Sequence, residues 1–180
     1  MRQFTTDRRS VVKGAAWAVP AISVAAAAPT LAASPTTAPH DLSTSVSGGG
    51  TRISGTQLDI TATNFINTGT ETVEGITVVF SASDGQTIED VQVFGQPIEN
   101  LAVGATISGE GTSVVTLNLA PGTELGQVTI PPDGGSYQSP VGQTLILGSD
   151  IPFTLSTTVS ATNAADGDVP FENVTDVPAV

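Results

Sequence analysis

The sequence contains no cysteine, so it can form no disulfide, no thiol nucleophile and no cysteine-ligated zinc site. It has one histidine, His40, and one lysine, Lys13, so the bases and amines used in nucleophilic catalysis are nearly absent. Carboxylate pairs such as Glu71 with Glu74 remain available for glycoside cleavage. Only 4% of the residues are aromatic, however, and a sugar cleft needs aromatic platforms. We therefore predict a protein that is not an enzyme and needs no cofactor.

Basic residues are also scarce, and their distribution is uneven. Of the 5 basic residues, all except Arg52 lie within the first 13 positions. Of the 17 acidic residues, only Asp7 lies before Ser34, which leaves a net charge of about −15 on the remainder. Proteins bind phosphate backbones mainly through lysine and arginine, so this charge excludes nucleic acid as a partner. Solubility outside the cell is the preferred explanation of the acidity, and a specific cationic ligand is the alternative.

The first 33 residues have the three parts of a signal peptide. Arg8, Arg9 and Lys13 form a basic start, and an uncharged, alanine-rich stretch follows it. Small residues at Ala32 and Ala33 then provide a cleavage site for signal peptidase. An uncleaved membrane anchor is the alternative, because about 20 apolar residues can span a bilayer. Pro20 and Pro29 interrupt the stretch, so we expect cleavage and no stable membrane span afterwards.

The segment from Asp7 to Lys13 resembles the twin-arginine class of export signals, whose members typically leave the cytoplasm folded. Both arginines and the lysine match that motif, whereas Asp7, Val11 and Val12 depart from it. The resemblance implies the twin-arginine (Tat) export machinery as a partner. It also implies a location outside the cytoplasm, either secreted or associated with the cell envelope.

Beyond the signal, alternating apolar and polar residues predict an all-β domain of antiparallel strands. The clearest alternation runs through 58–62, 76–80, 115–119 and 153–161, and shorter candidates lie at 91–94, 128–130 and 144–147. Turn signals such as Asp84-Gly85 and Pro121-Gly122 separate these segments. We expect about seven to nine strands in a β-sandwich over residues 51–165. Residues 34–50 are predicted to be a flexible Pro/Thr/Gly-rich spacer or a first edge strand, and residues 166–180 an acidic, solvated tail.

The segment Asn64–Thr70, followed by Val73, Gly75, Ile76 and Val78, resembles the immunoglobulin-like surface modules of bacteria. In those modules a strand ends in an Asn-Thr-Gly-Thr turn before the next strand begins. The resemblance implies an immunoglobulin-like sandwich that serves as a structural or interaction module. Its partner would be an envelope protein or a polysaccharide.

One metal site is conceivable from the sequence, at Asn163, Asp166 and Asp168, just after the longest predicted strand. Calcium prefers oxygen ligands on short acidic loops, but it usually takes about 6 to 8 of them. Three side chains therefore predict at most a weak site. A calcium-dependent adhesive or carbohydrate-binding module is thus the alternative to the structural or interaction module.

Overall fold

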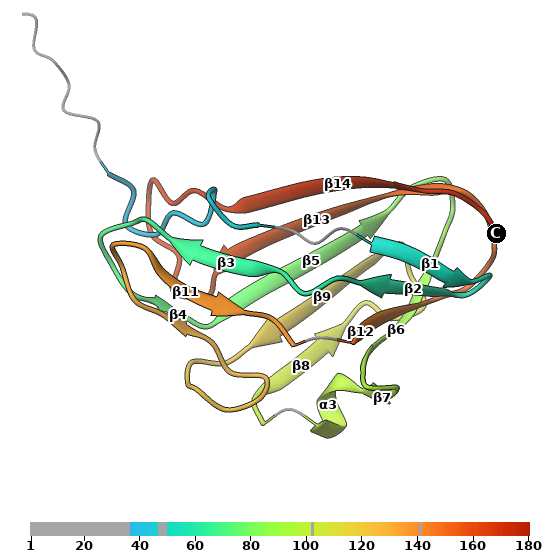
Figure 1. Ribbon diagram of the computed structural model, residues 1–180, viewed down its shortest axis with the longest axis horizontal. Coiled ribbons are helices and arrows are strands. Elements are labelled where there is room, and N and C mark those ends of the chain that lie inside the picture. Colours follow the sequence, from blue (N-terminus) through green and yellow to red (C-terminus); the bar gives the residue numbers. More distant parts are fainter. Residues whose placement is uncertain (1–36, 47–49, 102, 141) are drawn as a thin grey trace, which may run out of the picture. The chain divides into compact units, whose positions relative to one another are not determined.

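The computed structural model describes residues 37–180 except 47–49, 102 and 141 (Figure 1). Every pair of neighbouring strands in it is antiparallel, and the one helix within these residues, α3 (Ile98–Leu101), is a single turn. The prediction of an antiparallel all-β domain is therefore confirmed. The described residues form strands β1 to β14, more than the seven to nine predicted. The excess consists partly of two-residue strands, which are too short to show an alternating pattern.

The first sheet has the strand order β1-β2-β12-β6-β7. Its members are β1 (Gly50–Ser54), β2 (Gln57–Ile60), β12 (Gln143–Leu147), β6 (Ile88–Val93) and β7 (Gln96–Pro97). These strands are short, and the register shifts once between Arg52 and Ser54 and again between Ile146 and Leu147. Strand β1 contains no fully buried residue. Apolar burial alone therefore does not explain why β1 is held in place.

The second sheet has the strand order β14-β13-β5-β9-β8. Its members are β14 (Phe171–Val177), β13 (Phe153–Ala161), β5 (Ile76–Ala82), β9 (Val114–Leu119) and β8 (Ala105–Ser108). Buried and half-buried residues alternate without interruption along β5, as period-two patterning requires. Strand β13 coincides with the predicted 153–161 segment, and it pairs with β5 and β14 without a register shift.

The hydrophobic core lies between the two sheets. Side chains from both sheets line one interior gap, including Ile60 and Gln143 from the first and Val78, Leu155 and Phe171 from the second. Two further strand pairs lie beside these sheets (Figure 1). They are β3 (Asn64–Asn67) with β11 (Gly135–Gln138), and β4 (Val73–Glu74) with β10 (Thr129–Ile130). The ring of Phe65 on β3 stacks on Tyr137 of β11 with centroids 6.4 Å apart.

The structure differs from the spacer and tail predictions for two segments, whereas the alternative of an edge strand within 34–50 agrees with the bridges that residues 41 and 46 form. The part of the spacer that the structure describes is packed against the domain, because His40 and Leu42 are almost fully buried. Asp41 forms a parallel bridge with Val169, and Val46 forms an antiparallel bridge with Asn64. Residues 166–180 are not a solvated tail either, since β14 pairs along its whole length with β13. In strand β14 only Phe171 and Val177 are buried apolar residues, and Asn173 and Thr175 occupy the positions between them on the same face. The apolar alternation that marks a strand is therefore missing from this segment.

Candidate functional site

The only histidine, His40, lies at the centre of a polar cluster. This cluster joins the beginning of the described chain to the loop between β13 and β14. The side chain of His40 is 2% exposed, and its Nδ1 lies 2.9 Å from Oδ2 of Asp168. The backbone N–H of His40 donates to Oδ1 of the same carboxylate at 2.9 Å. On the other side of the ring, Nε2 lies 3.2 Å from Nδ2 of Asn163. His40 therefore connects residues 37–46 to the loop between β13 and β14.

The orientation of the Asn163 amide fixes the hydrogen-bonding roles of the His40 ring. Oδ1 of Asn163 accepts the backbone N–H of Glu74 at 2.9 Å, and its Nδ2 donates to the carbonyl of Thr72 at 3.1 Å. The amide group therefore presents an N–H to His40, so Nε2 acts as an acceptor and Nδ1 donates to Asp168. In this arrangement both ring nitrogens of His40 are engaged by neighbouring side chains, so the ring holds the fold together and is not available as a free base.

Asp168 is the electrostatic partner of this histidine. Burial raises the pKa of its carboxyl group, but hydrogen bonds from the Ala165 N–H and from His40 outweigh burial and leave the pKa below its ordinary value. The pKa of nearby Asp41 is also lowered, chiefly by a hydrogen bond from the hydroxyl of Ser43. Both carboxylates are therefore stabilised in their charged forms by groups of the chain itself.

Two of the three predicted calcium ligands already take part in hydrogen bonds within the chain. The side-chain oxygens of Asn163 and Asp168 already accept hydrogen bonds from the chain. No hydrogen bond joins Asp166 to either of them within the part of the chain that the structure describes. In the same residues, no three His, Asp or Glu side chains gather closely enough to hold a metal ion. A calcium ion would have to displace existing hydrogen bonds, so the calcium site stays a prediction.

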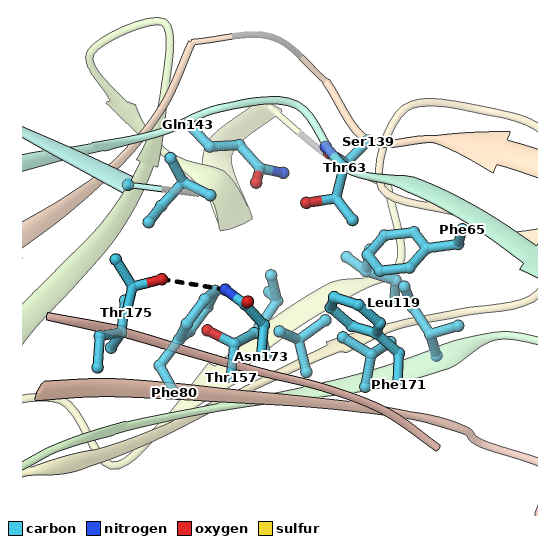
Figure 2. A pocket seen from close by; sticks show the side chains of 17 residues that line it. Thr63, Phe65, Phe80, Leu119, Ser139, Gln143, Thr157, Phe171, Asn173 and Thr175 are labelled. Atoms are coloured by element: carbon cyan, nitrogen blue, oxygen red, sulfur yellow. Dashed lines mark hydrogen bonds between the residues drawn. The ribbon is translucent and has the colours of Figure 1, made fainter. Parts of the chain in front are cut away.

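The gap between the two sheets is the first candidate for a binding site (Figure 2). Its walls are apolar side chains of both sheets, and neutral polar side chains face one another across it. Figure 2 shows the amide of Gln143 pointing into the gap, with Thr157 and Asn173 on the opposite side. Nδ2 of Asn173 donates to the hydroxyl of Thr175 at 3.1 Å. No lining residue carries a titratable group, so the gap cannot pair with a charged ligand.

Volume decides what this gap can hold. It offers about 40 Å³, and one buried water needs about 10 to 15 Å³. Pockets for small molecules typically offer roughly 300 to 1,000 Å³. The gap therefore has room for about three waters between its polar groups. A sugar or another small molecule does not fit unless the sheets separate.

A much larger space lies at the surface, where the loop before β13 meets the end of β14. This groove is shallow and widely open to solvent, so its volume of about 440 Å³ is not that of an enclosed cavity; it is lined by Asp84, Pro152, Phe153, Thr154, Asp176, Val177 and Pro178. The hydroxyl of Thr154 donates to Oδ1 of Asp176 at 3.1 Å, which holds one carboxylate at the edge of the groove. Phe153 and Val177 are buried, so the groove presents chiefly its prolines and two carboxylates, which suit a partner that carries positive charge.

The single arginine of the described residues, Arg52, contacts the groove residue Phe153 but serves the fold. The Arg52 side chain is 2% exposed and forms an ion pair with Asp150. Its Nη2 donates to the carbonyl of Ile151 at 2.9 Å, and its guanidinium lies 5.5 Å from the ring centroid of Phe153. Within the described residues its Nε has no hydrogen-bond partner. These contacts attach β1 to the segment that leads into β13.

The export residues Arg8, Arg9 and Lys13 and the cleavage residues Ala32 and Ala33 lie outside the described residues. Among the described residues, no helix has the length and apolar character needed to cross a membrane. No protein-family model matches the chain, and no curated protein matches it.

Sequence reasoning missed the role of His40, which it placed in a flexible spacer. The contact with Asp168 spans 128 positions of the chain, so no local pattern could reveal it. One signal was available, because the only histidine of an otherwise acidic chain is a natural partner for one of its carboxylates. The open groove was missed for a similar reason, since its residues come from three separate segments.

Proposed function

We propose that this chain is exported by the twin-arginine route and acts outside the cytoplasm as a non-enzymatic interaction module. In this proposal its fold is an immunoglobulin-like β-sandwich, and it is secreted or retained at the cell envelope. The paired arginines support the route, and the two facing antiparallel sheets support the sandwich.

The observation that carries the interaction role is the contrast between interior and surface. The interior gap has room for about three waters and no charged group. The open groove has about 440 Å³ and two carboxylates. A domain with this distribution is suited to bind at its surface, and its negative charge favours a basic partner.

A photo-crosslinking amino acid at Pro178 tests the interaction role in cells that export the chain. Pro178 lines the groove, so a partner seated there lies within reach of the reagent. We expect covalent adducts of higher mass outside the cytoplasm, and fewer adducts from the same amino acid at the exposed loop residue Glu110. Exported protein that forms no adduct from Pro178 would contradict a partner in this groove.

A further inference from the structure

Three tight turns of this domain share one backbone conformation but not one residue type. Each contains two successive residues with positive φ, of which the second is glycine: Asp84-Gly85, Asp133-Gly134 and Phe94-Gly95. The first residues of these pairs have φ values of 57°, 58° and 52°. Aspartate suits this left-handed conformation because its short polar side chain can form local hydrogen bonds. Phenylalanine does not, because its Cβ is crowded there and its side chain offers no such bond.

Phe94 is therefore a costly choice for the turn between β6 and β7, and burial does not explain it. Its side chain is 64% exposed, although phenylalanine normally contributes to stability by leaving water. The turn would form more readily with aspartate, as at the two matching positions. A strained backbone that carries an exposed aromatic ring indicates a role in binding.

The ring of Phe94 is held in place on the surface. The backbone N–H of Phe94 donates to the carbonyl of Gly142 at 3.0 Å. A Cβ atom added at Gly142 would lie 3.3 Å from Cδ1 of Phe94, so one edge of the ring rests against this glycine. The hairpin fixes the backbone on both sides through the pairing of Val93 with Gln96. A ring positioned in advance loses little conformational entropy when a partner binds.

Further exposed apolar side chains occur on the neighbouring segments. We call the set Phe94, Leu101, Val103 and Leu125 the Phe94 patch, whose members are between 38% and 64% exposed. Leu101 and Leu125 line one small hollow together with Val93, the residue that precedes Phe94. In Figure 1, α3 and β7 lie next to each other at the lower edge of the domain. Phe94 and Val103 do not line this hollow but lie on the segments next to it, on the turn after β6 and just after α3. Exposed apolar side chains on adjoining segments are typical of a protein-binding surface.

Charge indicates the kind of partner. Glu99 lies two residues before Leu101, and Glu124 directly precedes Leu125, so acidic groups accompany the apolar ones. Arg52 is the only arginine among the described residues, which contain no lysine. Its side chain is buried and paired with Asp150. A second copy of this domain therefore offers the patch no exposed cation. A segment with lysine or arginine next to apolar residues complements it in both respects.

We propose that the Phe94 patch binds a basic polypeptide segment, with an apolar side chain of that segment packed against Phe94. The proposal rests on the interaction role proposed above and names a second surface for it. Asp84 of the open groove precedes β6 and Phe94 follows it, so the two surfaces lie at opposite ends of this strand. Failure at the patch would therefore leave the result of crosslinking at Pro178 unaffected.

The test uses the exported form of the chain and a labelled 12-residue synthetic peptide of lysine, leucine and one tryptophan. Its dissociation constant is measured by fluorescence anisotropy for the natural chain and for Phe94→Asn. Asparagine adopts positive φ readily and adds no charge, so this variant should fold with an unchanged or higher melting temperature. We expect it to bind the peptide at least tenfold more weakly. Phe94→Trp should retain binding.

Matched controls separate the patch from the general acidity of the domain. Asp133→Asn changes the same position of an equivalent turn and should leave the dissociation constant within twofold. A peptide with serine in place of leucine and tryptophan should bind at least tenfold more weakly to the natural chain. Equal binding by Phe94→Asn and the natural chain would overturn the proposal. So would self-association of the natural chain that Phe94→Asn abolishes, because the patch would then be an interface between copies.

Discussion

The two sheets of this domain differ in the interactions that hold their strands in place. The second sheet contains the longest strand, β13, and has no register shift, and buried and half-buried residues alternate without interruption along β5. The first sheet has shorter strands, two register shifts and an edge strand, β1, without a fully buried residue. Its edge is attached instead by Arg52, which binds Asp150 and Ile151. Apolar burial thus explains the second sheet and the centre of the first, where Leu58, Val91 and Leu145 are at most 2% exposed, whereas the edge strand β1 needs polar contacts between distant residues.

Removing apolar volume from the second sheet should have the largest effect on stability. Leu155 is 3% exposed, so Leu155→Ala should lower the free energy of unfolding by about 2 to 5 kcal/mol through a cavity. Chemical denaturation measures this change. Its neighbour Ser156 points to the other face of β13, and Ser156→Ala should cost less than about 0.5 kcal/mol. Equal losses at the two positions would contradict the burial pattern of this strand.

Removing the polar attachment of β1 should have the next largest effect. Arg52→Met keeps an apolar stem but loses the hydrogen bond to Ile151 and the contact with Phe153, at a cost of about 1.5 to 3 kcal/mol. Thermal unfolding of both forms provides the comparison. Asp150 is 38% exposed, so Asp150→Asn should cost less than about 1 kcal/mol. If Asp150→Asn cost as much as Arg52→Met, the ion pair would be the main attachment.

The cluster around His40 gives a smaller effect that depends on pH. Asp168→Asn weakens charge-assisted hydrogen bonds and should cost about 1 to 2 kcal/mol at pH 7. The folded-state pKa of Asp168 is lowered, so its carboxylate stabilises the fold above the ordinary value of 3.8. This stabilisation is lost as the pH falls through the folded-state pKa. Denaturation curves of the two forms should therefore converge below a pH of about 4, and a constant difference would contradict this account.

Calcium should have the smallest effect. If Asn163, Asp166 and Asp168 bind it at millimolar concentrations, calcium equal to the dissociation constant stabilises the fold by about 0.4 kcal/mol. The melting temperature should then rise by only about 1 to 2 °C. A rise above roughly 5 °C that the double variant Asp166→Asn with Asp168→Asn abolishes would favour the calcium-dependent adhesive hypothesis.

The contrast between the sheets also explains how much the sequence could predict. Strand β13 was predicted to the residue because its alternation is long, and β5 and β9 were found for the same reason. Strand β14 was missed because Glu172 and Asp176 on its exposed face made the segment look like a solvated tail. The His40 cluster and the open groove depend on residues far apart in the chain. No periodicity encodes such contacts.

The proposed export of the chain from the cytoplasm can be tested more directly than any of these contacts. Changing Arg8 and Arg9 together to lysine keeps the charge of the leader but removes the paired arginines that the twin-arginine route recognises. Cell fractionation followed by mass determination of the amino terminus shows where each form accumulates. The account predicts that the natural chain leaves the cytoplasm and begins near Ser34, whereas the double variant stays inside and uncleaved. Normal export of the double variant, or a natural chain that retains Met1, would contradict it.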